Sequence, residues 1–343
     1  MNRKWSIIVF MLLFIITATG CGAGSDGQPS AGSPSGTEAA AGTEASAAES
    51  APAESAPAES EPGAAASVEH EWGTYQSETV PERIVTLDFS FIDTLTSLGV
   101  KPVGNAGVGT TKIPEYLQDR VTEADAADVG ERKAPNLEVV QSLKPDLIIA
   151  SVDRHSMIRG ELEGIAPTVA FDDVSYDEVL DNVRSIAAIL GKQEEAEQVV
   201  AGLNEKIAAV KQRIEGAPTI LVAGLFDDTF TVWVKDSFVG SLLSQVGADY
   251  AFNGEKDNLE GKGEGVHMTL ERLHEINPDY IMLYGDSPDK LQSNPLYQDL
   301  KSVKDGRFIV VDRNLWARGR GPIAANEILD ETLAALAADS ASE

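Results

Sequence analysis

The fold of this chain is decided by a stretch that occurs twice. Asn136-Leu137-Glu138-Val139-Val140-Gln141-Ser142-Leu143-Lys144-Pro145-Asp146-Leu147-Ile148-Ile149 recurs in outline as Thr269-Leu270-Glu271-Arg272-Leu273-His274-Glu275-Ile276-Asn277-Pro278-Asp279-Tyr280-Ile281-Met282. Each copy begins with a residue whose side-chain oxygen can accept the first free N–H groups of a helix. Apolar residues then recur at helical spacing up to a proline, which keeps the residue before it out of the helical region. A short apolar run follows, as in a buried strand. This repeat of capped helix, Pro-Asp turn and strand predicts two similar α/β lobes.

The rest of the folded body also alternates strands with helices. In the first half we predict strands at 83–87, 100–104, 147–150 and 168–171, and helices at 91–98, 137–143 and 157–163. In the second half we predict strands at 220–223, 230–234, 280–284 and 308–311, and helices at 238–246, 270–276, 295–301 and 324–337. Such alternation predicts a mostly parallel sheet with helices on both faces. The expected fold class is α/β, with two Rossmann-like lobes joined by one long helix.

The connection between the halves is helical. A helix at 176–190 is followed by a second at 194–214, whose apolar residues fall on one stripe. At 1.5 Å per residue this second helix is about 30 Å long, a stiff connector that predicts limited opening between the lobes. The expected domains are an N-terminal lobe at 68–193, the interlobe helix at 194–215 and a C-terminal lobe at 216–343. Residues 254–265, rich in glycine and charge, are expected to form a mobile loop.

The beginning of the chain predicts export and a lipid anchor. Arg3 and Lys4 precede an apolar run at residues 7–16, and Ala18-Thr19-Gly20-Cys21 follows. This is the pattern of a secretory signal and is too short to span a membrane. Its end resembles a bacterial lipobox, so we predict a signal peptide at 1–21 and lipidation of Cys21. Residues 22–67, dominated by Ala, Ser, Pro, Gly and Glu, predict a disordered tether. The expected location is the outer face of the cell membrane, as for a Gram-positive lipoprotein.

Composition narrows the chemistry. Cys21 is the only cysteine, which excludes internal disulfides, thiolate catalysis and cysteine metal sites. The formal net charge is −28, so nucleic acid is not expected as a partner. The sequence lacks a glycine-rich phosphate loop, a Gly-x-Ser-x-Gly elbow and a histidine pair at metal-ligand spacing. These absences weigh against an enzyme.

One segment is rich in arginine in this otherwise acidic chain. Asp312-Arg313-Asn314-Leu315-Trp316-Ala317-Arg318-Gly319-Arg320-Gly321 follows a predicted strand, at the carboxyl end where α/β sheets place ligands. If the segment is extended, Arg318 and Arg320 project to the same side, and Trp316 can share it. Guanidinium groups bind carboxylates through paired hydrogen bonds and stack on flat groups. The pattern indicates a site for a planar ligand with several carboxylates, and the alternative is a solvated basic loop paired with surface acids.

The first half offers a counterpart. Arg154 and His155 follow the strand of the first repeat, so Arg154 is a candidate anion binder. His155 is either a second donor or ligand, or an ordinary loop residue. Arg132 lies just beyond a short strand and could reach the same cleft. Trp233, in a predicted strand of the second half, is either a core residue or part of the cleft wall.

These motifs together resemble a known family. Phe89-Ser90-Phe91-Ile92-Asp93, the repeated Pro-Asp element, Arg154-His155 and Trp316-Ala317-Arg318-Gly319-Arg320-Gly321 are similar to the substrate-binding lipoproteins of iron–siderophore ABC importers. The likeness runs from about Arg83 to Ile328. Within that class, the Arg-His pair and the Trp-Ala-Arg-x-Arg-Gly element most resemble the iron(III) dicitrate-binding proteins.

The resemblance implies a receptor that binds ferric citrate between two lobes and delivers it to an ABC permease. Citrate would coordinate the iron, so no protein metal ligand and no further cofactor is implied. Arg132 and Arg154 from one lobe, with Arg318 and Arg320 from the other, would complement the negative charge of the complex. In this class a glutamate on each lobe contacts the permease, and by position these are Glu138 and Glu271. The alternative is that both are ordinary first-turn glutamates favoured by the helix dipole. We expect a monomer.

Other functions remain open from the sequence. Receptors for other ferric siderophores or haem share this fold, and a fold does not fix a ligand. A different class is an extracytoplasmic metal-dependent enzyme, which would need His155 or His267 with acids as metal ligands.

Overall fold

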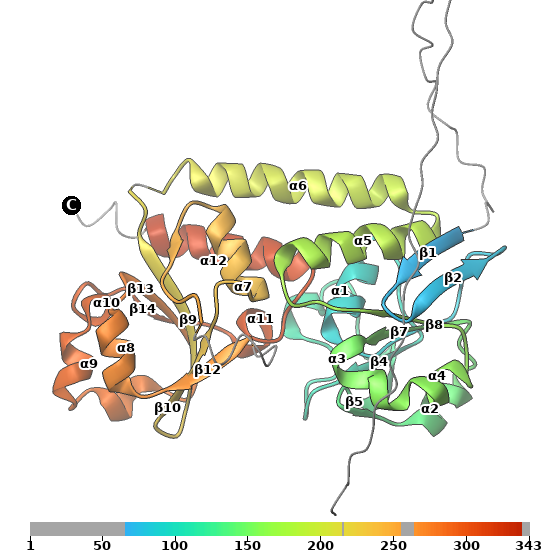
Figure 1. Ribbon diagram of the computed structural model, residues 1–343, viewed down its shortest axis with the longest axis horizontal. Helices are drawn as coiled ribbons and strands as arrows, with labels where there is room; N and C mark the ends of the chain where they lie inside the picture. The colour runs from blue at the N-terminus through green and yellow to red at the C-terminus, as the bar shows by residue number, and fades with distance from the viewer. Residues whose placement is uncertain (1–65, 215, 255–263, 338–343) are drawn as a thin grey trace, which may run out of the picture. The chain divides into compact units, whose positions relative to one another are not determined.

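Figure 1 shows the computed structural model of the chain, which describes residues 66–214, 216–254 and 264–337. The signal sequence, Cys21, nearly all of the predicted tether and most of the loop at 254–265 lie outside the described residues. The first described strand, β1 (Ala66–His70), begins just inside the segment predicted as tether and pairs with β2 (Gly73–Ser77) in a hairpin. In the part of the chain that the structure describes, no helix combines the length and the apolar character needed to cross a membrane.

The N-terminal lobe contains a six-stranded sheet in the order β6-β5-β4-β3-β7-β8. Its strands are β3 (Ile84–Thr86), β4 (Gly104–Gly107), β5 (Ala127–Glu131), β6 (Ala134–Pro135), β7 (Leu147–Ser151) and β8 (Thr168–Phe171). All neighbours are parallel except β5 and β6. The helical elements are α1 (Phe89–Ser97), η1 (Glu115–Leu117), α2 (Leu137–Ser142), α3 (Val152–His155), η2 (Ser156–Ile158) and α4 (Arg159–Glu163).

The C-terminal lobe contains a second six-stranded sheet, in the order β12-β10-β9-β13-β14 with β11 beside β9. Its strands are β9 (Thr219–Phe226), β10 (Thr229–Trp233), β11 (Asp249–Tyr250), β12 (Gly265–Met268), β13 (Tyr280–Gly285) and β14 (Phe308–Val310). β10 is antiparallel to β9 and β12. The helical elements are α7 (Phe238–Gln245), α8 (Leu270–Ile276), η4 (Pro288–Leu291), α9 (Pro295–Asp299), α10 (Lys301–Lys304), α11 (Arg313–Trp316) and α12 (Pro322–Ala337). The predicted fold class of two α/β lobes is confirmed.

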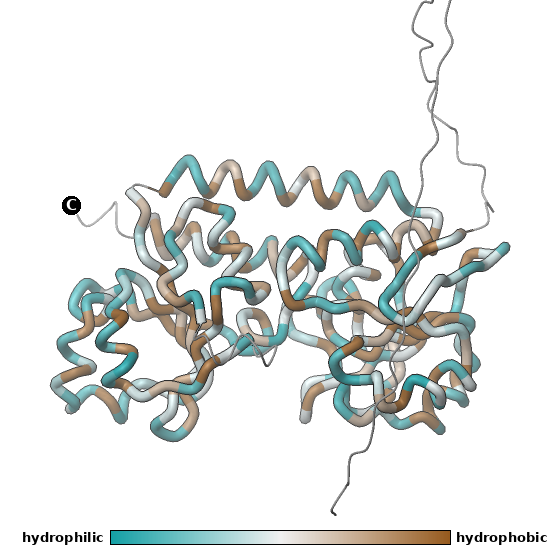
Figure 2. Tube along the Cα trace, viewed as in Figure 1, coloured by the Kyte–Doolittle hydropathy of each residue, from teal (hydrophilic) through white to brown (hydrophobic). Residues whose placement is uncertain are grey.

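Two helices connect the lobes. α5 (Tyr176–Leu190) starts at a capping box of Ser175 and Glu178 and ends at Gly191, whose φ of 64° is left-handed. α6 (Gln193–Lys211) then runs from the first lobe to the second, as Figure 1 shows, and buries Ala196, Val200, Leu203 and Val210 on one stripe. Figure 2 shows hydrophobic residues gathered along the strands of each lobe and an alternation of hydrophilic and hydrophobic residues along α6. The predicted long interlobe helix is confirmed, although it ends at Lys211 rather than near residue 214.

The repeated sequence has the same structure in both lobes. Asn136 caps α2 and Thr269 caps α8, each by accepting backbone N–H groups with its side-chain oxygen. Lys144 and Asn277, the residues before the two prolines, have φ of 48° and 47°. Both turns therefore leave the helix through the left-handed region, because the residue before a proline is excluded from the right-handed helical one.

The aspartates of the repeat fix the neighbouring strands. Asp146 accepts the backbone N–H groups of Glu82 and Arg83, both at 2.8 Å, where the chain enters β3. Asp279 accepts the N–H and the hydroxyl of Thr219, both at 2.8 Å, at the start of β9. Each Pro-Asp turn thus sets the register between the strand of the repeat and the first parallel strand of its lobe.

Candidate functional site

The site is built at the carboxyl ends of the strands of the first lobe, where loops from β3, β5, β7 and β8 meet. Asp88 follows β3, is buried and caps α1 by accepting the N–H of Phe89 at 2.7 Å. Arg132, just after β5, places Nη1 3.1 Å from Oδ1 of Asp88, and Arg154 of α3 places Nε 3.1 Å from Oδ2. Burial raises the pKa of Asp88, but Arg154, Arg132 and Arg320 outweigh burial and lower it. Asp88 is therefore an anion held between two arginines.

The arrangement continues across to the second lobe through Arg320. Its Nη1 donates to the backbone oxygen of Asp173 at 2.9 Å and lies 3.5 Å from Oδ1 of the same residue, which follows β8. Its Nη2 donates to Glu264 at 2.5 Å. Arg154 also lies 3.9 Å from Asp173. Burial would lower the pKa of Arg320, but Glu264 and Asp173 outweigh it and raise that pKa further above the usual range.

Cations and anions alternate along a row of six residues. In order, they are Arg132, Asp88, Arg154, Asp173, Arg320 and Glu264. Each guanidinium group is close to at least one carboxylate, so the three arginines are oriented by the protein itself rather than left in solvent. Charge-assisted contacts of this kind fix the direction of a guanidinium group.

Arg318 differs from the other predicted arginines. Its Nη1 donates to the side-chain oxygen of Asn314 at 2.7 Å, and within the described residues it forms no ion pair with a carboxylate. Burial, followed by repulsion from Arg313 and Arg132, lowers its pKa. Asn314 itself lies 3.5 Å from the hydroxyl of Thr111 in the first lobe, so Arg318 lies at the boundary between the lobes. Arg318 is thus a partly buried cation with hydrogen-bonding capacity that the acids of the described residues do not use.

The prediction that His155 is a donor or ligand facing a bound molecule is wrong. The side chain is fully buried, with Nε2 2.8 Å from the backbone oxygen of Arg132 and Nδ1 3.0 Å from the backbone nitrogen of Ser151. Burial, the main cause, lowers its pKa, so the neutral form is favoured. His155 instead holds the backbone of Arg132 in place from within the core.

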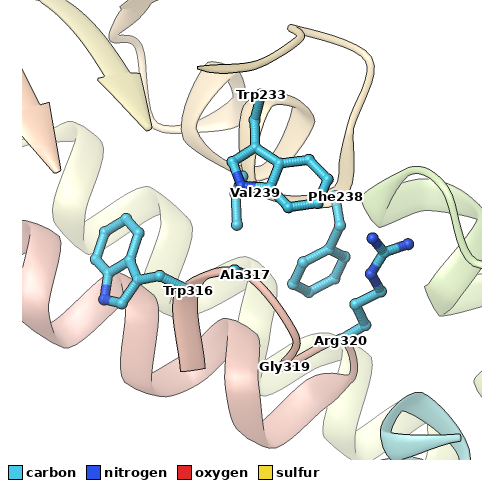
Figure 3. Close-up of a pocket in the computed structure, with 7 residues that line it drawn as sticks. All are labelled: Trp233, Phe238, Val239, Trp316, Ala317, Gly319 and Arg320. Atoms are coloured by element: carbon cyan, nitrogen blue, oxygen red, sulfur yellow. The ribbon is translucent and has the colours of Figure 1, made fainter. Parts of the chain in front are cut away.

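The prediction that Trp316 shares the side of the arginines is wrong in its geometry, although Trp316 lines the same small cavity as Arg320. It assumed an extended segment, but residues Arg313–Trp316 form the short helix α11, capped by Asp312. The indole is fully buried, and its Nε1 donates to Glu331 of α12 at 2.5 Å. Figure 3 shows the ring of Trp316 turned away from Arg320. A helical turn rotates the side chains by about 100° per residue, which separates residues that an extended segment would align.

Trp233 lies beside Arg320, as the cleft-wall alternative requires. The guanidinium carbon of Arg320 is 5.8 Å from the centre of the Trp233 ring. In Figure 3 the two side chains border a small cavity, which is also lined by Phe238, Val239, Trp316, Ala317 and Gly319. The cavity volume is about 10 Å³, room for no more than one water molecule. Because Arg320 is buried against Asp173 and Glu264, a larger ligand can reach it only if one of these two contacts opens.

Sequence reasoning did not find Asp88, Asp173 and Glu264. Asp88 could have been found, because an aspartate between a predicted strand and a predicted helix is both a helix cap and a residue at the ligand-binding edge. Asp173 likewise follows a predicted strand. Glu264 gives no such signal, because it lies in the glycine-rich stretch before an unpredicted strand. Burial raises the pKa of Glu264 despite Arg320.

The remaining predicted residues lie elsewhere. Glu138 and Glu271 are exposed at the second positions of α2 and α8, one on each lobe. Hydrogen bonding from Thr269 lowers the pKa of Glu271. Among residues 66–337, apart from the gaps given above, no group of three or more His, Cys, Asp or Glu side chains is arranged to hold a metal ion. His267 is exposed and contacts Thr231 at 3.1 Å.

The chain resembles known proteins over most of its folded part. Residues 84–315 match the family described as periplasmic binding protein. YhfQ of Bacillus subtilis (strain 168), provisionally named as an ABC transporter substrate-binding lipoprotein, is 36% identical over 77% of this chain and 86% of its own length. YfmC of the same organism, named as a Fe(3+)-citrate-binding protein, is 32% identical over 74% of this chain and 80% of its own.

Two further proteins extend the comparison. FecB of Escherichia coli (strain K12), named as a Fe(3+) dicitrate-binding periplasmic protein, is 30% identical over 78% of this chain and 89% of its own. The structure of Staphylococcus aureus SirA complexed with staphyloferrin B superposes with a TM-score of 0.67, at 26% identity, over 79% of this chain and 98% of SirA. These relatives are substrate-binding proteins, which overturns the alternative of a metal-dependent enzyme. The chain belongs to the periplasmic binding protein family and is a binding protein rather than an enzyme.

Proposed function

We propose that this protein is an extracytoplasmic receptor that binds ferric citrate between its lobes and delivers it to an ABC importer. The observation that carries the proposal is the convergence of four arginines from two lobes on one boundary, in a chain whose net charge is −28. Guanidinium forks match carboxylates, and citrate would satisfy the iron with its own oxygens. Two relatives named for ferric citrate support the choice of ligand.

The contacts suggest different roles for the arginines. Arg318 forms no ion pair with a carboxylate in the described part of the chain, so it would be the first to bind a citrate carboxylate. Arg132 and Arg154 share Asp88, so they would add directed hydrogen bonds but little net charge. Arg320 is buried against Asp173 and Glu264, so it would reach the ligand only by exchanging one of these carboxylates for one of citrate. Trp233 would form part of the wall beside it.

A different ferric siderophore is the second candidate. Staphyloferrin B, bound in the SirA structure, supports a broader reading in which the site accepts other siderophores. A siderophore with carboxylates would use the same arginines. A ferric hydroxamate would use them less, because hydroxamate groups are not carboxylates, and haem would engage them only through its two propionates.

The remaining parts of the proposal concern anchoring and docking. Lipidation of Cys21 would hold the protein at the outer face of the membrane, and the tether predicted at 22–67, whose last two residues lie in β1, would connect the anchor to the lobes. Glu138 and Glu271, exposed at equivalent positions of the two lobes, would contact the permease. The proposed domains keep the predicted plan: an N-terminal lobe, the interlobe helix and a C-terminal lobe.

Tryptophan fluorescence tests the ligand. The purified protein is titrated with ferric citrate, iron-free citrate and a ferric hydroxamate, and Trp233 beside Arg320 is the expected reporter. Saturable quenching by ferric citrate, lost in Arg318→Ala but kept in Arg184→Ala, supports the proposal. Arg184 is the matched control, because it is exposed on α5 and pairs with Asp181 and Glu197 away from the site. A response to the hydroxamate alone would reject citrate.

Docking is tested separately from binding. Glu138→Lys and Glu271→Lys reverse two exposed charges and should leave the affinity for ferric citrate unchanged. Uptake of iron from ferric citrate by cells that depend on this receptor should fall for each variant. Normal uptake by the double variant would show that the two glutamates are ordinary first-turn residues.

A further inference from the structure

One contact between the lobes has no part in the ligand site itself. Asp93 belongs to α1 of the first lobe and is fully buried. Its Oδ1 accepts the N–H of Ile323 at 2.9 Å, and its Oδ2 accepts the N–H of Ala324 at 2.9 Å. These two N–H groups belong to the first turn of α12 in the second lobe. A side chain of one lobe therefore caps a helix of the other.

Such a cap is physically effective. The first N–H groups of a helix have no partner within the helix, and they form the positive end of its dipole. α12 is 16 residues long, and the two oxygens of the Asp93 carboxyl group accept two of its free donors at once. The N-terminus of α12 is thereby tied to α1.

The packing around the contact between Asp93 and α12 is tight. A Cβ atom added to Gly321 would lie 2.4 Å from Cγ of Asp93, and Gly321 has a φ of 147° that favours glycine. Gly319 is equally confined, because its Cβ would lie 2.5 Å from the backbone oxygen of Leu315. Residues 317–321, which carry Arg318 and Arg320, are thus held by α11 at one end and by Asp93 at the other.

We propose that Asp93 is a positioning residue: by capping α12 from the other lobe, it fixes the segment at 317–321 and so directs Arg318 and Arg320 relative to the first lobe. The consequence for affinity rests on the proposed function, but the positioning itself does not. Asp93 lies in α1, five residues after its cap Asp88. A single helix therefore supports the arginines of both lobes. Asp88 holds Arg132 and Arg154, and Asp93 holds the segment of Arg318 and Arg320.

Amide hydrogen exchange tests the positioning without a ligand. In Asp93→Ala we expect the amides of Ile323 and Ala324, and those of residues 317–321, to exchange at least about tenfold faster. Amides in β9 and β13 should keep their rates. Asp93→Asn preserves the volume and one acceptor oxygen, so it covers the case in which the alanine variant does not fold, and it should release one of the two capped amides.

A matched control lies in the same lobe. Asp146 also accepts two backbone N–H groups with its two oxygens, but both donors belong to its own lobe. Asp146→Ala should speed exchange near Glu82 and Arg83, and it should leave residues 317–324 and the affinity for ferric citrate unchanged. If Asp146→Ala also released residues 317–324, faster exchange there would reflect general loosening and the proposal would fail.

Affinity and a double-mutant cycle complete the test. We expect Asp93→Ala to weaken ferric citrate binding by at least about tenfold, because displaced arginines lose their geometry. Gly321→Ala pushes against Asp93, so its penalty should be smaller in the Asp93→Ala background, apart from the strain of its φ. Additive penalties, unchanged exchange, or faster exchange with unchanged affinity would each overturn the proposal. If the native protein does not bind ferric citrate, the proposed function fails, and local exchange alone decides for or against the role of Asp93.

Discussion

The two copies of the repeated stretch build the same scaffold and then diverge. In both, a capped helix ends at a left-handed residue before a proline, and the following aspartate fixes the start of the neighbouring parallel strand. After the strand the copies differ. β7 leads into α3, which carries Arg154 to Asp88. β13 leads into a turn in which Asp286 accepts the N–H of Asp227 at 2.8 Å, and the next arginine in the sequence is Arg307.

The second lobe takes its arginines from another strand, β14. They reach the boundary through α11 and the segment at 317–321. The difference shows that the repeated part serves folding, whereas the ligand chemistry lies in loops that the repeat does not constrain. The contact between the lobes in which Asp93 of α1 caps α12 belongs to neither copy of the repeat.

The largest expected effect distinguishes Asp93, which links the two lobes, from aspartates such as Asp279, whose contacts lie within one lobe. Burial, the main cause, raises the pKa of Asp93 from its usual 3.8 to about 7, with Tyr116 and Arg120 nearby. The folded protein therefore holds this proton more tightly than the unfolded chain, and its contribution to stability is lost as the pH rises from about 4 through 7. Between pH 5 and pH 8, urea unfolding should show that the free energy of unfolding of Asp93→Asn rises relative to that of the native protein. The gain is on the order of 3 kcal/mol.

Asp279 provides the contrast. Burial opposes ionisation, but the bonds from Lys301 and Thr219 prevail and lower its pKa below 3.8. Its contribution to stability is present above the unfolded pKa and is lost only in acid, so the difference between Asp279→Asn and the native protein should stay constant from pH 5 to pH 8. Parallel pH dependences for the two variants would mean that Asp93 is not set apart by its burial between the lobes.

The next effect compares the arginines of the two lobes. Arg318→Ala removes a cation that no carboxylate of the described residues neutralises, whereas Arg154→Ala removes one that is shared with Asp88. For ferric citrate we expect the dissociation constant to rise about 100-fold in Arg318→Ala, equivalent to about 2.7 kcal/mol. We expect a smaller rise, about tenfold, in Arg154→Ala. Equilibrium titration at fixed ionic strength measures both. A reversed order would assign the main contact to the first lobe.

The fold was largely predictable from the sequence, because the signals that determine it are local. The repeat, the two connecting helices and the central strands all follow from apolar periodicity, caps and prolines. Short elements were missed where periodicity is weak. β5 has the sequence Ala-Asp-Val-Gly-Glu, with only Val129 buried, and the strand predicted at 100–104 lies instead at Gly104–Gly107. Pairing with neighbours, which no local signal reports, forms these strands.

The site was predictable in its arginines but not in their partners. Arg132, Arg154 and Arg320 do converge, yet what orients each is a carboxylate distant in sequence, such as Asp173 for Arg320. His155 and Trp316 were misplaced because their neighbours in sequence suggested a loop, whereas tertiary packing buries both. Asp93 could not be assigned at all, since its role depends on a helix that begins more than 200 residues later.

A smaller effect compares the two Pro-Asp turns. Asp279 is partly buried; it accepts two hydrogen bonds from Thr219 and also pairs with Lys301 at 2.8 Å. Asp146 is exposed and accepts two backbone N–H groups. Buried hydrogen bonds cost more to lose, so Asp279→Ala should lower the free energy of unfolding by about 2 kcal/mol and Asp146→Ala by about 1 kcal/mol. Urea denaturation measures both. Equal losses would mean that the aspartate contributes through the turn itself and not through the strand it fixes.

The smallest effect tests the left-handed residue of each turn. Lys144 has a φ of 48° and is exposed, so Lys144→Gly relieves strain at some cost in chain entropy and should stabilise the protein by about 0.5 kcal/mol. Asn277 has nearly the same φ, but its Oδ1 also accepts the N–H of Lys301 at 2.8 Å. Asn277→Gly should therefore destabilise by about 0.5–1 kcal/mol, because the lost bond exceeds the relieved strain. Opposite signs in paired urea titrations would show that equal backbone geometry in the two lobes is maintained by different side-chain bonds, and equal signs would show that backbone strain dominates both.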